Sequence, residues 1–332
     1  MMKMNRVLLV TGLVVCLLMT GVVSAATWPT KSINIIVPWN PGGASDLTAR
    51  TLGVEMEKIL KQRISVTNTP GASGAIGTQA SFDTAHDGYT WSGNADGSIV
   101  TYQILGLLKF SHKEYASFMA IFTPNVICVP ANSPIKDVAG LIDAMKNKTV
   151  TVGSAGVGSG GHIAAETFKK YTKTEYRHVP YQGGAPAVTA TVKGEVDAVM
   201  QLSMEVTEML RAKQLRALAV MDSVPLEVEG YGSIPPITKA IPEFAPLGQK
   251  FGLFMPKDIP ADAMKKITKA FVTATKSESV KKFAAQRGCK VISLYGPKAE
   301  QSMNQSASLS AWLLYETGVA KTSPLEYNIS KP

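Results

Sequence analysis

Three glycine-rich segments carry the residues whose types and spacing could do chemistry. They run over 40–46, 153–162 and 182–185, and they contain all the Gly-Gly pairs of the chain. Each segment follows a strand-like run and precedes a helix-like run. The first N–H groups of a helix are unpaired and carry a partial positive charge, and glycine lets a ligand approach the backbone closely. One such loop could be an ordinary turn, but three predict a site for a small anion such as a carboxylate, without any arginine.

The same segments contain only fragments of catalytic motifs. Gly156, Gly158 and Gly161 match the spacing of a dinucleotide-binding loop. However, Glu175 precedes the next strand, whereas an acid that binds ribose should end it. The sequence has no phosphate-binding loop with Gly-Lys-Ser/Thr and no Gly-x-Ser-x-Gly elbow. Because its four histidines lack metal-ligand spacing and no Cys-x-x-Cys occurs, we expect no metal, no cofactor and no enzyme.

The elements that must position these segments alternate between strand-like and helix-like runs, which is typical of an α/β fold. The expected strands cover 33–38, 149–152 and 176–181, and the expected helices cover 47–60, 162–171 and a run from 186 onward. Ligands of open α/β sheets bind beyond the carboxyl ends of the strands, where all three loops would lie. Asn94 and Asp96 would lie at the end of a further strand, where they could line the cleft or cap a helix.

Composition sets the class of protein. The 332 residues are enough for about two domains. Hydrophobic residues make up 45% of the chain and charged residues 18%, a composition that excludes intrinsic disorder. The net charge is +9, but the basic residues form no stripe interleaved with aromatics, so no nucleic-acid partner is expected. Cys128 and Cys289 could form a bridge in an oxidising compartment, although two free thiols are the simpler expectation.

Residues 1–26 have the three parts of a secretory signal peptide. Lys3 and Arg6 precede an apolar run over 7–23, which ends in the small residues Ser24-Ala25-Ala26. An uncleaved anchor is the alternative, but the run is slightly short for a span of about 20 residues. We therefore expect cleavage after Ala26 and a periplasmic location.

Several blocks along the rest of the chain stand in a particular order. They are Trp28-Pro29, Pro41-Gly42-Gly43-x-Ser45-Asp46, Asn68-x-Pro70-Gly71-Ala72, Asp87-Gly88-Tyr89-Thr90, Gly156-x-Gly158-Ser159-x-x-His162, Val179-Pro180-Tyr181-x-Gly183, Gly194-x-Val196-Asp197 and Gly252-Leu253-Phe254-x-Pro256. In order and spacing they resemble the substrate-binding proteins of tripartite tricarboxylate transporters, the Bug-type receptors, over nearly all of the mature chain.

The resemblance implies an α/β, two-domain periplasmic binding protein of type II, the Venus-flytrap kind, with a ligand cleft between the domains. It implies a monomeric extracytoplasmic receptor that captures a small organic acid for the membrane components of such a transporter. A receptor for a signalling system is the alternative, and an exported enzyme is a more remote one. Because such chains cross between domains twice, we expect residues 27–124 with 248–332 in one domain and 125–247 in the other, with hinges near Asn125 and Gly248.

In this family the first two loops pinch the ligand carboxylate. The resemblance therefore implies ligand contacts from Pro41, Gly42, Gly43, Ala44, Ser45 and Asp46, and from Ser154, Gly158, Ser159, Gly160 and His162. Trp39, Asn94, Gln182, Gly183 and Asp197 complete the expected set. Trp39 stands where Phe is more usual in the family and Gln182 where Lys is frequent. The ligand thus stays open among dicarboxylates, tricarboxylates, aromatic acids and amino acids.

Overall fold

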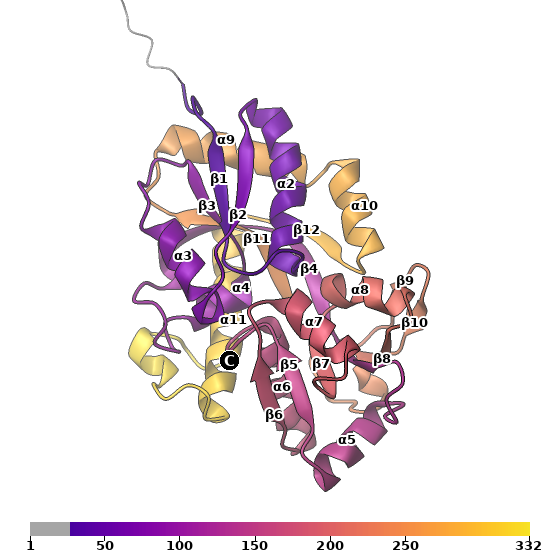
Figure 1. Cartoon of the computed structure of the whole chain (residues 1–332). Coiled ribbons are helices and arrows are strands. Elements are labelled where there is room, and N and C mark those ends of the chain that lie inside the picture. Colours follow the sequence, from indigo (N-terminus) through magenta and orange to yellow (C-terminus); the bar gives the residue numbers. More distant parts are fainter. Residues whose placement is uncertain (1–26) are drawn as a thin grey trace, which may run out of the picture.

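The structure is a computed structural model, and it describes residues 27–332 of the chain. The expected signal peptide, residues 1–26, lies outside the described residues. The described chain forms two α/β domains, one above the other in Figure 1. No helix in this part of the chain is long and apolar enough to cross a membrane.

The first domain is built on a mixed sheet in which neighbouring strands follow the order β2-β1-β3-β11-β4, with β12 also paired to β4. Its strands are β1 (Ile33–Val37), β2 (Ile64–Asn68), β3 (Thr90–Ala95), β11 (Gly248–Pro256), β12 (Lys290–Leu294) and the first part of β4 (Tyr115–Pro130). Its helices are α2 (Ala44–Leu60), α3 (Ala75–Phe82), α4 (Asp96–Thr101), α9 (Ala261–Ala274), α10 (Glu278–Gln286) and α11 (Gly296–Glu316).

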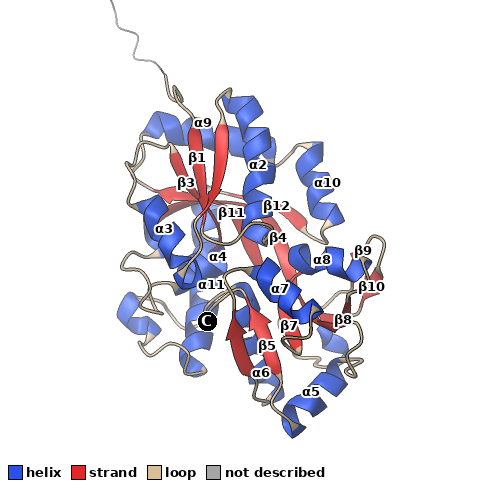
Figure 2. Ribbon diagram, in the orientation of Figure 1, coloured by secondary structure: helices blue, strands red, loops and turns tan. Residues whose placement is uncertain are grey.

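Helices cover both faces of this sheet, as Figure 2 shows. Leu52 and Met56 of α2 share one apolar cluster with residues of α9 and α10, and Ile33 and Ile35 of β1 belong to the same cluster. Residues of α3, α4 and α11 form a separate cluster with Phe254 of β11. Burial on both faces is what an apolar strand such as Ile33–Val37 requires.

The second domain has the strand order β4-β7-β5-β6, with β8 on the other side of β4. Its strands are β5 (Thr151–Ser154), β6 (Arg177–Pro180), β7 (Ala198–Leu202), β8 (Leu215–Val220) and a small hairpin of β9 (Leu226–Val228) and β10 (Gly232–Ile234). Its helices are α5 (Val138–Asn147), α6 (Gly160–Thr172), α7 (Gly184–Val192) and α8 (Ser203–Arg211). Clusters around α5 with α6 and around α7 with α8 bury its apolar residues.

Strand β4 passes from one domain to the other. Its residues 115–124 pair with β11, and residues 125–130 pair with β7 and β8. Beside it, the backbone N–H of Asn125 donates to the carbonyl of Leu247 at 3.1 Å, just before β11 begins. The two places at which the chain crosses therefore lie side by side.

The helices that follow the glycine-rich segments begin earlier than expected. Helix α6 starts at Gly160 and α7 at Gly184, so the second glycine of each pair lies inside the helix. The N–H groups of the first turn have no partner in the helix, so these glycines leave donors available at each helix start. These glycines consequently belong to the helix termini rather than to flexible turns.

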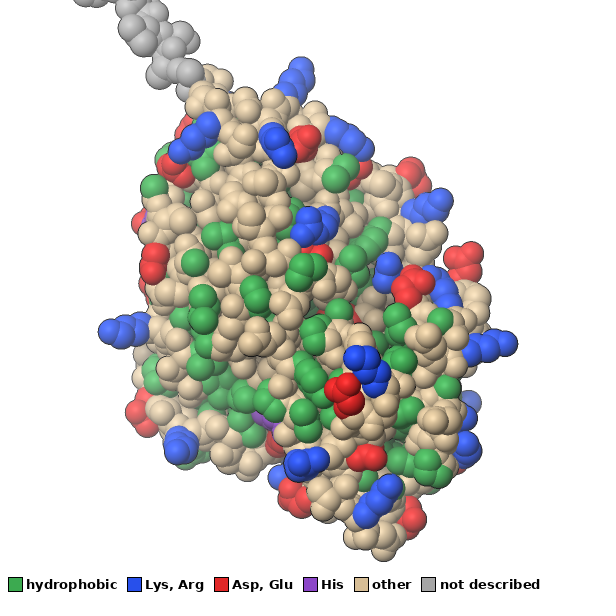
Figure 3. All heavy atoms as spheres, viewed as in Figure 1, with side chains coloured by type: hydrophobic (Ala, Val, Ile, Leu, Met, Phe, Trp, Pro, Cys, Tyr) green, Lys and Arg blue, Asp and Glu red, His purple; other side chains and the backbone are tan. Residues whose placement is uncertain are grey.

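The cysteines and the charged surface add two observations. Cys128, in β4, and Cys289, before β12, are both free thiols. On the face drawn in Figure 3, Lys and Arg side chains are interspersed with Asp and Glu and form no stripe. No group of three His, Cys, Asp or Glu residues within 27–332 could hold a metal ion.

Candidate functional site

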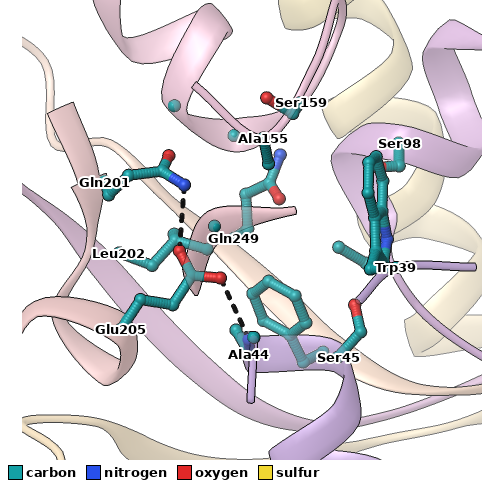
Figure 4. A pocket seen from close by; sticks show the side chains of 16 residues that line it. Trp39, Ala44, Ser45, Ser98, Ala155, Ser159, Gln201, Leu202, Glu205 and Gln249 are labelled. Carbon is teal, nitrogen blue, oxygen red and sulfur yellow. Dashed lines mark hydrogen bonds between the residues drawn. The ribbon is translucent and has the colours of Figure 1, made fainter. Parts of the chain in front are cut away.

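A pocket lies where the two domains meet (Figure 4). Its walls come from the starts of α2, α4, α6, α7 and α8 and from β11. The lining residues are Trp39, Gly43, Ala44, Ser45, Ala95, Ser98, Ala155, Ser159, Gly160, Gly161, Gly184, Gln201, Leu202, Glu205, Gln249 and Phe251. The cavity has a volume of about 20 Å³, which is room for roughly one water molecule. A solute of several heavy atoms can enter only if the domains move apart.

The first glycine-rich segment joins β1 to α2. Of the six residues expected from it, Gly43, Ala44 and Ser45 line the pocket, whereas Pro41 and Gly42 are exposed outside it. Asp46 is buried and turns away from the pocket. Its carboxylate accepts hydrogen bonds from the N–H of Gly42 at 3.0 Å, from Arg50 and from Asn68. Asp46 thus holds the loop in shape instead of touching a ligand.

The pKa of Asp46 agrees with that structural role. Burial by itself raises the pKa, but hydrogen bonds from Arg50, Gly42 and Asn68 outweigh it and leave the pKa below its usual value. The carboxylate is therefore ionised, and its hydrogen bonds are made within the first domain.

The second segment joins β5 to α6. Ser159 and Gly160 line the pocket, together with Gly161. The hydroxyl of Ser159 is buried and has no hydrogen-bond partner among the described residues. An orphaned hydroxyl beside the unpaired N–H groups of a helix start is the kind of donor set that suits a carboxylate.

Three residues expected from this segment support the loop from behind. The backbone N–H of Gly158 donates to Nδ1 of His162 at 3.0 Å, so Nδ1 carries no proton. Burial, helped by the neighbouring His178, lowers the pKa of His162 to about 3, which keeps the ring neutral. The Oγ atom of Ser154 lies 2.6 Å from Nε2 of His178. None of Ser154, Gly158 and His162 lines the pocket.

The remaining expected residues separate into two groups. Trp39 lines the pocket, and its Nε1–H donates to Oδ1 of Asn94 at 3.4 Å. Asn94 itself is buried, contacts Trp39 and does not line the pocket. Gln182 is exposed. Its backbone carbonyl accepts a hydrogen bond from the backbone N–H of Asn40, in the other domain, at 3.2 Å. Gly183 precedes α7 with a φ of 136°, and its neighbour Gly184 lines the pocket instead.

Asp197 is placed at the wrong end of the sheet for ligand binding. Its carboxylate accepts hydrogen bonds from the N–H and the hydroxyl of Thr151, at 2.8 and 2.7 Å. Thr151 begins β5, whereas the pocket lies beyond Ser154 at the other end of that strand. Asp197 therefore links the start of β5 to the residue before β7, and it does not line the pocket.

Ten of the sixteen lining residues were not among the expected ligand contacts, and the larger polar or aromatic side chains among them are Gln201, Glu205, Gln249 and Phe251. Gln201 is the last but one residue of β7 and Glu205 lies in the first turn of α8, so they repeat the strand-end, helix-start arrangement without glycine. That arrangement was the available signal. Gln249 and Phe251 reach the pocket because β11 lies between β3 and β4, a pairing that no local pattern reveals.

Glu205 joins the two domains across the pocket. Its Oε1 accepts a hydrogen bond from the N–H of Ala44, at the start of α2, at 3.0 Å. Its Oε2 accepts one from Nε2 of Gln201 at 3.1 Å. Burial raises the pKa of Glu205 to about 7, against the opposing hydrogen bonds from Ala44 and Leu202. In this arrangement the α2 terminus already faces a carboxylate of the protein.

Three side chains occupy the space above the glycines of the helix starts. A Cβ atom on Gly160 would lie 2.7 Å from Cδ of Gln249. A Cβ on Gly184 would collide with the carboxylate of Glu205, and one on Gly161 with the amide of Gln201. At these positions side chains approach the backbone closely, and any larger residue would displace Gln249, Glu205 or Gln201.

Comparison with known proteins gives a consistent result. Residues 48–310 match the family described as tripartite tricarboxylate transporter family receptor. The chain is 30% identical over 271 residues to a protein encoded in the tcbD–tcbE intergenic region of Pseudomonas sp. (strain P51), covering 79% of each chain. It is 29% identical over 300 residues to protein BugT of Bordetella pertussis, covering 88% of this chain and 91% of that one.

Two solved structures share the fold. One, described as a periplasmic transporter, is 26% identical, with a TM-score of 0.81 over 88% of this chain and 99% of that chain. The other is MatC of Rhodopseudomonas palustris with bound malate. It is 23% identical, with a TM-score of 0.76 over 87% of this chain and 98% of that one.

Proposed function

The chain belongs to the tripartite tricarboxylate transporter receptor family, and we propose that it binds one small carboxylate-bearing solute between its two domains. It then presents the loaded, closed form to the membrane components of a tripartite transporter. The observation that carries the proposal is the pocket itself. The starts of α2 and α6 belong to different domains and face one cavity, where the hydroxyl of Ser159 has no hydrogen-bond partner within residues 27–332.

The proposed ligand site centres on the start of α6. There Ser159, Gly160 and Gly161 offer a hydroxyl and helix-terminal N–H groups, a set that holds an anion without a cation. No Lys, Arg or His is among the described residues that line the pocket. The malate in the related MatC structure supports a carboxylate as the bound group.

The proposal also covers the domain boundaries and the cellular location of the protein. We assign residues 27–124 with 248–332 to one domain and 125–247 to the other, with one ligand per monomer. Membership of a family of periplasmic binding proteins implies a periplasmic location. We propose that residues 1–26 direct export and are removed after Ala26; an intact mass of exported protein that still includes the leader would contradict this.

The test of the site is a pair of glycine variants. Gly160→Ala should weaken binding of a carboxylate by at least about tenfold, because the new methyl group displaces Gln249 and narrows the α6 terminus. Ligands are first identified by native mass spectrometry of the purified protein and by the rise in Tm across a panel of organic acids. Affinity is then measured by calorimetry.

Gly140→Ala is the matched control. Gly140 also lies in the first turn of a helix of the second domain, and its Cβ would make only an ordinary contact with Asp137, at 3.4 Å. This variant should bind as the natural protein does. If Gly160→Ala retains full affinity, the site is not at the α6 terminus. If no organic acid raises the Tm, the proposed function is wrong.

A further inference from the structure

Glu205 is the sole ionisable residue among the described residues that line the pocket. It stands in the first turn of α8, and part of its surface remains open. Figure 4 shows its carboxylate on one side of the pocket, beside Gln201, with Trp39 and Ser98 on the other side. A site that held only a carboxylate would gain nothing from a second carboxylate in its wall, because like charges repel.

The carboxylate of Glu205 has neutral partners. It accepts hydrogen bonds from the N–H of Ala44 and the amide of Gln201. The cations that stand next to the pocket-lining segments are used elsewhere: Lys250 pairs with Asp96 at 2.8 Å, and Arg50 pairs with Asp46 at 2.9 Å. A carboxylate that is removed from water without a cation is costly to keep ionised.

Gln201 adds a second unused acceptor to the same wall. Its Oε1 is buried and has no hydrogen-bond partner among the described residues, while its amide nitrogen is committed to Glu205. Each oxygen of the Glu205 carboxylate can also accept more than one hydrogen bond. The wall therefore offers several acceptor sites, and an ammonium group, with three donors and no acceptor, is their complement.

We infer that Glu205 and Gln201 receive a cationic nitrogen of the solute, so that the solute of this receptor is a zwitterion with an ammonium group as well as a carboxylate. The inference rests on the proposed function, in which the solute carboxylate lies at the α6 terminus. Burial raises the pKa of Glu205 to about 7, and an adjacent cation would favour the ionised form. A dicarboxylate would instead place its second charge against Glu205.

The test compares acids that differ in one group. Butyrate, 2-aminobutyrate, 4-aminobutyrate and glutarate are titrated into the purified protein by calorimetry at about pH 8, where Glu205 is mostly ionised. One of the two amino acids should bind at least about tenfold more tightly than butyrate, and glutarate should bind more weakly than that amino acid. Glu205→Gln should remove the preference for the ammonium group, so that neither amino acid binds more tightly than butyrate to this variant.

Glu208→Gln is the matched control, since Glu208 lies one turn further along α8, is exposed and pairs with Arg211. It should keep the natural preference. The natural protein decides the question even if Glu205→Gln does not fold. Equal affinity for butyrate and both amino acids overturns the inference, as does tighter binding of glutarate; either result leaves carboxylate binding intact. If none of the four acids binds while other organic acids do, the acid found by native mass spectrometry is compared with its deaminated or aminated analogue in the same way.

Discussion

The hydroxyl of Ser159 is buried at the start of α6 without a partner among the described residues. A buried polar group left unpaired costs about 1–3 kcal/mol, so its place in the pocket makes sense if a ligand supplies the missing hydrogen bond. Ser159→Ala should therefore weaken carboxylate binding by about tenfold while the Tm of the ligand-free protein stays the same or rises. Calorimetry and thermal unfolding measure the two effects separately.

Ser154→Ala is the contrasting variant at the other end of the same loop. The hydroxyl of Ser154 lies 2.6 Å from Nε2 of His178 and accepts a hydrogen bond from the N–H of Gly156. Its loss should lower the free energy of unfolding by about 1–2 kcal/mol. Natural affinity in Ser159→Ala would show that this hydroxyl does not touch the ligand.

Single residues also show where prediction from the sequence stops. Gly43, Ser45, Ser159 and Gly160 could be predicted because a glycine pair after a strand marks a helix start near the ligand side of an α/β sheet. His162 lies two residues beyond Gly160, but successive residues of a helix point in different directions, and its ring faces Gly158 instead of the pocket. Gln249 could not be predicted, because it reaches the site through the pairing of β11 with β3 and β4.

At the scale of elements, helix α6 and strand β6 are joined by two stacked histidine rings. The centroids of His162 and His178 are 4.0 Å apart, and the rings are nearly parallel. Burial lowers the pKa of His162 to about 3 and that of His178 to about 4. Both rings are therefore neutral in the folded protein, and Glu166 and Tyr176 pack beside them.

These lowered pKa values predict a loss of stability in acid. Below a pH of about 6.5, both histidines are protonated in the unfolded chain but stay neutral in the folded protein. The free energy of unfolding therefore decreases as the pH falls toward 4. Each histidine contributes up to about 1.4 kcal/mol per pH unit over this window. Chemical denaturation between pH 7.5 and pH 5 should show a shallower dependence for His178→Gln than for the natural protein.

His86→Gln serves as the control for this pH dependence. The hydrogen bond that His86 donates to the carboxylate of Asp258 raises the pKa of His86, so this histidine stabilises the fold in acid and its removal should not reduce the acid loss. Equal pH slopes in the natural protein and in His178→Gln would mean that the stacked pair does not govern acid stability. The lowered pKa of His112, in the first domain, accounts for a residual slope in every variant.

The strand–loop–helix units themselves were predictable from the sequence, and the structure confirms the α/β class. Periodicity located β1 with α2, β5 with α6 and β6 with α7. The helix starts were predicted late, because each glycine pair was assigned to the loop, whereas α6 begins at the first glycine of its pair and α7 at the second glycine of its pair. The unit of β7 and α8 was missed as part of the site, since its junction at Leu202 and Ser203 contains no glycine.

For the whole molecule, several hydrogen bonds cross from one domain to the other beside the pocket. The N–H of Val157 donates to the hydroxyl of Ser73 at 3.0 Å, Asn40 donates to the carbonyl of Gln182, and Ala44 donates to Glu205. On the far side of the pocket the domains share β4 and the start of β11. Strands that run from one domain into the other at one edge of the interface are typical of a hinge.

The last prediction is therefore ligand-driven closure about the crossings at 124–125 and 247–248. With a cavity of only about 20 Å³ between them, the domains must separate to admit a solute, and a solute that contacts both can shift the equilibrium back by its extra affinity for the closed form. Small-angle scattering should show a smaller radius of gyration at saturating ligand than without ligand.

Trp39 gives a second measurement, because it lines the pocket and is only 6% exposed in this structure. The fluorescence change on binding should vanish in Trp39→Phe and persist in Trp28→Phe, since Trp28 packs against Tyr89 away from the pocket. An unchanged radius of gyration at saturation, with no fluorescence response from Trp39, would mean that the ligand binds without the closure proposed here.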